Sequence, residues 1–417
     1  APAATTGHHA GNHGASAAEH GLRLLAGLLG MQPQELSPAK PLSAYGADSI
    51  VMAQLAMQLQ AEVDPGVTLT DIEPCVTVRD LLAVLAERGH RTGPEGQALP
   101  AEISKLFTRP AARFLELQRL NRVDRGRPVF WFHGALGGCE IYQELARRID
   151  RPFFGLQARG WMTTRQPLQG IQAMAAYYVQ AIQSVQSHGP YDLGGYSLGG
   201  MLAYEVTRQL QELGEAVATL VMLDSPDVTG ERTARLADKT RLLQTVNMAL
   251  QMTIGETPER FAEVLIHRDA VDLSLPLPEY RQRLTALARQ RGLKMSDDRL
   301  LQLMEQVTGL QQAYQVEHYR ILPLPNAEDV AGYYFRNASG LWMGDLEPYF
   351  STDSREFAAF NHADYWQAWQ RQLPNFEMIE VASSNHMTLL TEPGVFEVIA
   401  EFCASLYAET VPEDTVG

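Results

Sequence analysis

The sequence has few cysteines, little positive charge and no long apolar run. Its three cysteines, Cys75, Cys139 and Cys403, are scattered and odd in number, which excludes a disulfide framework and predicts a reducing compartment, the cytoplasm. Lys and Arg total 34 against 49 Asp and Glu, and this net charge of -15 argues against a nucleic-acid partner. Because no apolar run approaches the length of a membrane span, we also expect no membrane partner.

The N-terminal stretch "APAATTGHHAGNHGAS" lacks the basic-then-apolar order of a secretory signal, so we expect a flexible linker over residues 1–17. His8, His9 and His13 lie in this stretch without Cys or carboxylate neighbours, and we therefore expect no metal site there. The length of 417 residues, with 45% hydrophobic and 20% charged residues, is typical of two or three globular domains.

Leucines at helical spacing characterise residues 18–89. The pattern "EHGLRLLAGLLG" predicts a helix over Glu19–Gly30, and "SIVMAQLAMQLQAEV" predicts a second helix that starts near Ser49. A third helix is predicted in "TVRDLLAVLAERG", with Gly89 as its end. These helices predict a small all-α bundle.

Ser49, in "GADSI", has two interpretations. It is either a helix N-cap, since Asp-Ser before an apolar helix satisfies free backbone N–H groups, or a modified serine. The residues "YGADSIVMAQL" resemble the phosphopantetheine attachment loop of carrier domains, and "LTDIEPCVTVRDLLAVL" is similar to the later helices of polyketide-type carriers. The resemblance implies an acyl carrier domain over residues 18–89 with 4′-phosphopantetheine on Ser49. It also implies a phosphopantetheinyl transferase as partner, whose metal Asp48 helps to hold.

Residues 90–109 are expected to form an inter-domain linker, because "RGHRTGPEGQALP" concentrates Gly, Pro and polar residues. Strands and helices then alternate. The apolar stretches "PVFWFHG", "FFGLQ", "YDLGGY" and "ATLVMLD" predict strands, with helices near 140–149 and over 171–187. This alternation predicts a mostly parallel sheet wrapped by helices over residues 110–410.

The stretch "GYSLGG" follows one of these strands and contains a G-x-S-x-G pattern. In such a pattern the chain turns sharply from strand into helix, so the residues two before and two after Ser197 must be small. Gly195 and Gly199 meet this need. A phosphate-binding turn is the alternative. The spacing of the glycines, however, matches neither of the Gly-rich phosphate motifs G-x-x-x-x-G-K-[ST] and G-x-G-x-x-G.

An acid and a base follow the serine. The order Ser197, Asp224, His386 is that of the α/β-hydrolases, and each residue lies at the carboxyl end of a predicted strand. In this arrangement His386 accepts the Ser197 proton while Asp224 fixes the histidine tautomer. The alternatives are that Asp224 caps a helix, that His386 is an unrelated surface residue, and that Asp345 supplies the acid.

A serine hydrolase also needs donors for the oxyanion. The backbone N–H of Leu198 is one candidate, and Ala135 in the Gly-rich loop "FHGALGG" is the other. His133 is interpreted as a structural loop residue, because it precedes the serine in an order that this fold does not use.

Four stretches, "VFWFHGALGG", "YDLGGYSLGG", "LVMLDSP" and "SSNHMTLL", resemble, in order, the blocks of the thioesterase domains that end polyketide and nonribosomal peptide synthases. The resemblance implies an α/β-hydrolase fold with a helical lid, and it favours Asp224 over Asp345 as the acid. Gly134 stands where many relatives have proline after the loop histidine. Because Ala135 is the next residue of this loop, the assignment of Ala135 as an oxyanion donor depends on this position. As a whole, the chain resembles the C-terminal acyl carrier protein plus thioesterase didomain of a modular polyketide or hybrid synthase.

Helical runs interrupt the strand pattern at about residues 230–325. An insertion placed after Asp224 would overlie the serine, so we interpret it as a lid. Its apolar residues either line a flexible acyl chamber or form the core of the lid. The candidates are Met248, Met252, Met304 and Tyr314.

The leading hypothesis is release of an acyl chain. The carrier presents an acyl thioester delivered by upstream synthase modules, and Ser197 accepts the chain before water or an internal nucleophile releases it as an acid or a ring. Transfer to an external amine or alcohol is a variant of this chemistry. A non-catalytic carrier and cargo-binding module is an alternative of another class, and the carrier domain disfavours a standalone esterase or lipase.

Overall fold

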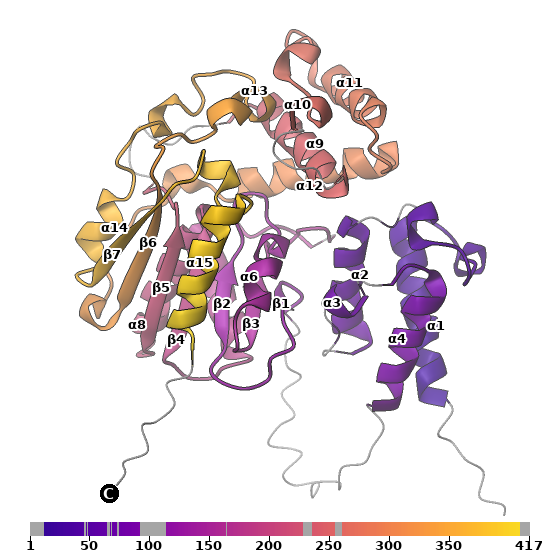
Figure 1. The fold of residues 1–417 in the computed structure, drawn as a ribbon, viewed down its shortest axis with the longest axis horizontal. Helices are drawn as coiled ribbons and strands as arrows, with labels where there is room; N and C mark the ends of the chain where they lie inside the picture. The colour runs from indigo at the N-terminus through magenta and orange to yellow at the C-terminus, as the bar shows by residue number, and fades with distance from the viewer. Residues whose placement is uncertain are drawn as a thin grey trace, which may run out of the picture. The chain divides into compact units, whose positions relative to one another are not determined.

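The chain divides into two compact units, Ala1–Leu115 and Glu116–Gly417. Figure 1 colours the helices of the first unit indigo to purple, and the second unit runs from purple through magenta and orange to yellow. The computed structural model describes residues 12–45, 47, 49–64, 67, 69–72, 75–91, 114–163, 165–227, 236–254 and 261–408.

Helices build the described part of the first unit. Apolar residues four apart on one helix, such as Leu55 and Leu59, are fully buried, as expected for a helix at the centre of a small bundle. The first helix begins at Asn12, earlier than the expected Glu19. The elements are α1 (Asn12–Leu29), η1 (Pro33–Glu35), η2 (Leu42–Tyr45), α2 (Ser49–Glu62), α3 (Leu69–Ile72) and α4 (Val78–Arg91).

Reciprocal hydrogen bonds define the start of α4. The N–H of Thr77 donates to Oδ2 of Asp80 over 2.8 Å, and the N–H of Asp80 donates to Oγ1 of Thr77 over 3.3 Å. The helix continues past Gly89 to Arg91, so the predicted stop at Gly89 is wrong. A glycine inside a helix costs only about 1 kcal/mol, and the packing of α4 against α1 offsets this cost.

A seven-stranded sheet forms the centre of the second unit, with the order β1-β3-β2-β4-β5-β6-β7. Strand β1 is antiparallel to β3, and all other neighbours are parallel. Every residue of β2 and β4 is buried, as expected for central parallel strands covered on both faces. The bounds are β1 (Leu117–Arg119), β2 (Val129–Phe132), β3 (Phe153–Leu156), β4 (Tyr191–Tyr196), β5 (Val217–Leu223), β6 (Ala331–Asn337) and β7 (Phe376–Val381).

Helices cover the sheet (Figure 1). Trp131 of β2 shares an apolar cluster with residues of α6 and α15. The next residue, Phe132, instead packs against Tyr178 of α7, with ring centroids 5.6 Å apart, so the two faces of β2 have different partners. Helix α7, predicted over 171–187, ends at Gln183. The bounds are α6 (Gln143–Arg147), α7 (Ile171–Gln183), α8 (Leu198–Glu212), α14 (Gln367–Gln372) and α15 (Pro393–Leu406).

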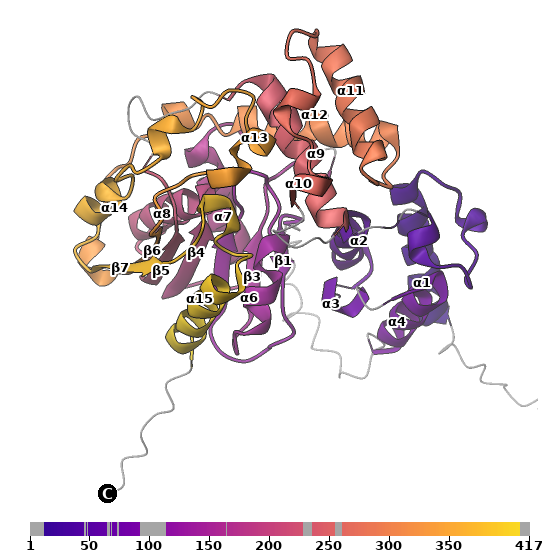
Figure 2. The same cartoon turned by 45° about the horizontal axis from the view of Figure 1, so that its top comes forward.

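Among the described residues between β5 and β6 there are four α-helices, and Figure 2 shows them together at one end of the sheet. Helix α9 packs against both α11 and α12. Leu310 of α12 reaches the loop after β2, where its Cδ1 lies 3.3 Å from the position of a Cβ on Gly137. Helix α12 therefore borders that loop. The bounds are α9 (Asp238–Ile254), α10 (Phe261–Val264), α11 (Leu277–Gln290) and α12 (Asp297–Ala313).

The segment between β6 and β7 contains short helices joined by irregular chain. Two buried side-chain amides of α9 form hydrogen bonds with this segment. Nδ2 of Asn247 donates to the carbonyl of Tyr349 over 2.6 Å, and Nε2 of Gln244 donates to that of Phe350 over 2.8 Å. The short elements of this unit are η3 (Glu140–Tyr142), η6 (Arg268–Ala270), η7 (Val316–His318), η8 (Ala327–Asp329), η9 (Gly344–Leu346), α13 (Glu347–Phe350), η10 (Ala358–Phe360) and η11 (His386–Thr388).

Candidate active site

Ser197 occupies the turn between β4 and α8. Its backbone, with φ 58° and ψ -122°, lies outside the regions that most residues adopt, as expected for a sharp strand-to-helix turn. A Cβ on Gly199 would lie 2.1 Å from the carbonyl oxygen of Phe132, and one on Gly195 would lie 2.2 Å from the carbonyl carbon of Gly199. Both positions therefore require glycine, as the motif predicts.

Ser197, His386 and Asp224 form one hydrogen-bonded chain. Nε2 of His386 lies 3.0 Å from Oγ of Ser197, and Nδ1 of His386 lies 2.8 Å from Oδ2 of Asp224. All three are buried, with exposed fractions of 9% for Ser197, 3% for His386 and 0% for Asp224. Ser197 follows β4, His386 follows β7 and Asp224 follows β5. The three side chains lie close together because the carboxyl ends of parallel strands meet at one edge of the sheet. The structure thus brings together the three residues that the sequence order singled out.

The carboxylate of Asp224 has further partners on its second oxygen. The hydroxyl of Tyr365 donates to Oδ1 over 2.9 Å, and the N–H of Asn337 donates to it over 3.4 Å. Burial and the neighbouring Asp224 raise the pKa of Tyr365 well above its usual range, so the hydroxyl remains a donor. The alternative acid, Asp345, is exposed in η9. Sequence reasoning missed Tyr365, because the segment that carries it shows no helical or strand period.

Tyr196, the residue before the serine, packs on the histidine. Its ring stacks on that of His386 with centroids 4.8 Å apart, and its hydroxyl donates to the backbone carbonyl of His386 over 2.6 Å. The sequence motif gave no role to this position, which therefore adds a contact that the pattern alone did not indicate.

His133 lies away from this chain of hydrogen bonds. Its Nε2 contacts the hydroxyl of Tyr178 at 2.8 Å and its Nδ1 contacts the carbonyl of Gly134 at 2.7 Å. Burial lowers the pKa of His133 from 6.5 to about 4, so the ring is neutral at neutral pH. These contacts fit a structural role.

The two expected oxyanion donors are Leu198, which follows the serine in the chain, and Ala135, in the loop after β2. Leu198 is the first residue of α8 and is buried. Ala135 is exposed in the loop after β2. A Cβ on Gly134 would lie 3.6 Å from the carbonyl oxygen of Tyr196, so the loop runs beside the residue that precedes the serine.

Ser49 is the first residue of α2. The start of a helix presents free backbone N–H groups that favour a phosphate, and a serine there offers a hydroxyl for esterification. This position fits a phosphopantetheine group. The side chain of Ser49 and the whole of Asp48 lie outside the described residues.

The remaining predicted residues divide between the two parts of the chain. Met248 is buried in α9 and Met304 in α12, and Tyr314 is buried directly after the end of α12. The side chains of Met252 and His13 lie outside the described residues, as do His8 and His9. Among the residues that the structure describes, no three His, Cys, Asp or Glu side chains are grouped so that they could hold a metal ion. Within the same residues, no helix is both long and apolar enough to cross a membrane.

Comparison with known families identifies the second unit. Residues 127–406, more than half of the chain, match the thioesterase domain family. The chain belongs to the thioesterase domain family. The thioesterase domain is preceded, over residues 22–85, by a match to the phosphopantetheine attachment site family. The chain therefore combines a domain that carries 4′-phosphopantetheine with a thioesterase of the α/β-hydrolase type, which confirms both predicted families.

The similar proteins are synthases, of which this chain matches a small part. The polyketide synthase PksR of Bacillus subtilis (strain 168) is 46% identical over 385 residues, which cover 92% of this chain and 14% of PksR. The indigoidine synthase of Dickeya dadantii (strain 3937) is 30% identical over 213 residues, which cover 50% of this chain and 13% of that protein. The chain thus spans a small part of the length of these relatives.

A solved four-domain nonribosomal peptide synthetase, bound to AMP and glycine, is similar in fold with a TM-score of 0.55. The sequences are 16% identical, and the match covers 98% of this chain and 27% of that one. At this identity the likeness concerns the fold alone.

Proposed function

We propose that the thioesterase domain releases an acyl chain from the carrier domain of the same polypeptide, at the end of a polyketide or hybrid polyketide and nonribosomal peptide assembly line. The observation that carries the proposal is the hydrogen-bonded chain Ser197–His386–Asp224, which lies in a polypeptide that also has a phosphopantetheine attachment domain. The chain would receive its substrate from upstream synthase modules.

In this proposal each residue of the triad has a separate role. His386 accepts the proton of Ser197 through Nε2 as the serine oxygen attacks the thioester carbonyl. Asp224, bonded to Nδ1, holds the ring in the required tautomer and stabilises the imidazolium. The N–H groups of Leu198 and Ala135 would donate to the oxyanion, which stabilises the charge that develops on the carbonyl oxygen. As the C–S bond breaks, protonated His386 gives its proton to the leaving sulfur, which leaves the acyl group on Ser197 and a thiol on the carrier.

The acyl-serine is released by a second attack. His386 takes a proton from water, or from a hydroxyl or amine of the acyl chain, and the result is an acid or a ring. An external amine or alcohol is the variant nucleophile. The geometry of the triad disfavours a non-catalytic cargo-binding module, since a binding surface has no need of a serine, a histidine and an aspartate in this order.

Ser49 would hold the phosphopantetheine on the carrier. When bound, this group supplies the thiol that carries the acyl chain as a thioester. Esterification of the Ser49 hydroxyl requires a phosphopantetheinyl transferase, and Asp48 would help to hold the metal ion of that partner. The start of α2 favours the phosphate at this position.

The proposed domain limits are a linker over 1–17, a helical carrier over 18–89, a linker over 90–109 and the thioesterase over 110–410. The helices of the carrier extend into both linkers, since α1 begins at Asn12 and α4 ends at Arg91. The helices between β5 and β6, within about 230–325, would form a lid over the acyl pocket. Two observations support the lid: the insertion follows Asp224, and α12 borders the loop that bears Ala135. The cytoplasm stays the predicted location.

Hydrolysis of a soluble acyl-pantetheine thioester tests the triad. We expect Ser197→Ala to abolish turnover and Asp224→Asn to lower kcat by about 10³- to 10⁴-fold, because the amide favours the wrong tautomer of His386. Asp345→Asn is the matched control and should leave kcat within about 2-fold, since its side chain is exposed in η9. Turnover by Ser197→Ala at the wild-type rate, or an equal loss in both Asp variants, would refute the assignment.

A further inference from the structure

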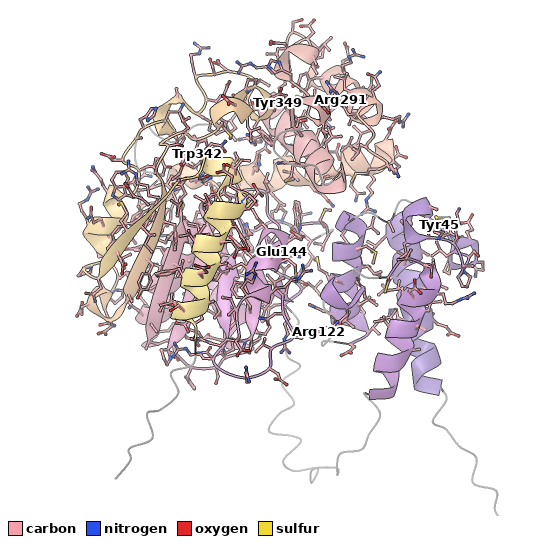
Figure 3. The ribbon with its side chains drawn as sticks, in the orientation of Figure 1. Tyr45, Arg122, Glu144, Arg291, Trp342 and Tyr349 are labelled. Atoms are coloured by element: carbon pink, nitrogen blue, oxygen red, sulfur yellow. The ribbon has the colours of Figure 1, made fainter. Side chains whose placement is uncertain are left out.

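The indole of Trp342 lies flat on the imidazole of His386. The two ring centroids are 3.6 Å apart and the planes differ by 10°. Trp342 is buried, and Figure 3 shows it at the end of the sheet where the inserted helices lie. The histidine of the triad thus has an aromatic contact from the segment between β6 and β7, in addition to Tyr196 from β4.

Trp342 is itself held by contacts on several sides. Its backbone N–H donates to Oδ1 of Asn361 over 2.8 Å, and Phe360 stacks on its indole with centroids 4.8 Å apart. The N–H of His386 donates to the carbonyls of Trp342 and Leu341, each over 3.0 Å. Trp342 and His386 are therefore joined through both their rings and their backbones.

Two glycines permit this close approach of the backbones. Gly340 and Gly344 flank the stretch and have φ values of +68° and +54°, in the left-handed region that favours glycine. A Cβ on Gly344 would lie 3.3 Å from the Cβ of Asn385, the residue before His386. The two glycines of "GLWMG" thus allow Trp342 to pack against the turn that contains His386.

The same segment also reaches the acid of the triad. Tyr365 meets the indole of Trp342 edge-on, with centroids 5.5 Å apart, and its hydroxyl donates to Oδ1 of Asp224. One stretch of irregular chain therefore contacts both the base and the acid. A contact that served only to fill space would not need to meet both groups.

We infer that Trp342 is a positioning residue for the reaction, which orients the His386 ring and stabilises its imidazolium through the face of the indole. The inference rests on the proposed role of His386 as general base. The π-face of tryptophan carries partial negative charge and attracts a cation more strongly than that of any other side chain. This attraction grows when the imidazole gains the proton of Ser197, so it stabilises the transition state more than the resting enzyme.

Other groups face the same imidazole. Asp224 approaches from the end of β5 and Tyr196 from β4, while Tyr365 acts through Asp224. Glu392, at the start of α15, accepts hydrogen bonds from Ser384 and Thr388 on either side of His386. Burial raises the pKa of Tyr196 and of Tyr365, so neither hydroxyl ionises near neutral pH. These groups are the same in every variant below.

The experiment compares Trp342→Leu and Trp342→Phe in the full chain, with a soluble acyl-pantetheine thioester as substrate. Leucine keeps water from the ring but offers no π-face, whereas phenylalanine keeps a weaker one. We expect Trp342→Leu to lower kcat by about 10-fold, Trp342→Phe to lower it by about 3-fold, and KM to stay within about 2-fold. The acidic midpoint of the pH profile of kcat/KM should move to lower pH, further for leucine, because protonation of the ring loses its stabilisation.

Trp366→Leu is the matched control, since the ring of this tryptophan packs on Arg336 and not on His386; it should leave both kcat and the acidic midpoint unchanged. Equal losses in the leucine and phenylalanine variants, or an unmoved midpoint, would overturn the inference. If Trp342→Leu does not fold, the midpoint of Trp342→Phe decides alone. Ser197→Ala separates the two claims: turnover in that variant refutes the proposed function, whereas an inactive Ser197→Ala beside normal Trp342 variants refutes only the role of Trp342.

Discussion

At the scale of single residues, two buried histidines of the thioesterase differ in chemistry because their ring nitrogens have different partners. His386 has a carboxylate on one nitrogen and a serine on the other, so it can gain and lose a proton during a reaction. His133 is buried without a carboxylate on either ring nitrogen and contacts Tyr178 and a backbone carbonyl. A buried ring in such surroundings resists protonation.

This difference predicts a pH dependence of stability. The pKa of His133 is about 4 in the folded chain against 6.5 in a model peptide, so the unfolded state alone binds this proton between these values. Neutral His133 therefore makes its full contribution to the free energy of unfolding above pH 6.5. As the pH falls toward 4, the free energy of unfolding decreases by about 3 kcal/mol from this cause. Urea unfolding of the wild type and His133→Gln should show a flatter acid limb in the variant.

All five tryptophans lie in the second unit, so their fluorescence reports on the thioesterase alone in this measurement. If the wild type and His133→Gln lose the same free energy of unfolding between pH 6.5 and pH 4, the buried neutral histidine is the wrong explanation.

At the scale of elements, the turn between β4 and α8 depends on contact between helix and strand backbones. Gly199 of α8 lies against the carbonyl of Phe132 at the end of β2, with no room for a side chain. This packing sets the direction of α8 and hence the position of the serine at its start. The need for glycine at position 199 therefore comes from the contact between α8 and β2 and not from the chemistry of Ser197.

We therefore expect Gly199→Ala to destabilise the thioesterase by about 1–3 kcal/mol, because α8 must shift away from β2. Gly309→Ala, in the middle of α12, is the matched control: no atom lies within 4 Å of its new Cβ, and alanine should stabilise that helix by up to about 1 kcal/mol. Urea midpoints followed by tryptophan fluorescence measure both. A Gly199→Ala variant as stable as the wild type would contradict the packing argument.

The sequence predicted those parts of the site that follow regular elements. Ser197 and Asp224 come directly after apolar strands, and His386 follows the run "FEMIEVA", so the ends of three strands could be placed before any coordinates were known. Strand β6 and the residues Trp342 and Tyr365 were missed. They lie in or beside an irregular segment whose contacts are between residues far apart in the chain, and such contacts leave no period in the sequence.

At the scale of the whole molecule, the chain divides its work between two units. The first is a phosphopantetheine carrier and the second a thioesterase. A carrier needs an exposed attachment point, whereas a serine hydrolase needs buried, preorganised groups. The central claim is that Ser197 removes the acyl chain that Ser49 presents.

The most direct test of this claim is an intact-mass time course. A phosphopantetheinyl transferase and octanoyl-coenzyme A load the full chain, either as wild type or as Ser197→Ala, with Ser49→Ala as the variant that should gain no arm. We expect the acyl mass to disappear from the wild type and to persist on Ser197→Ala. Loss of the acyl group at the same rate from both, or its equal persistence on both, would show that Ser197 does not remove the chain that Ser49 presents.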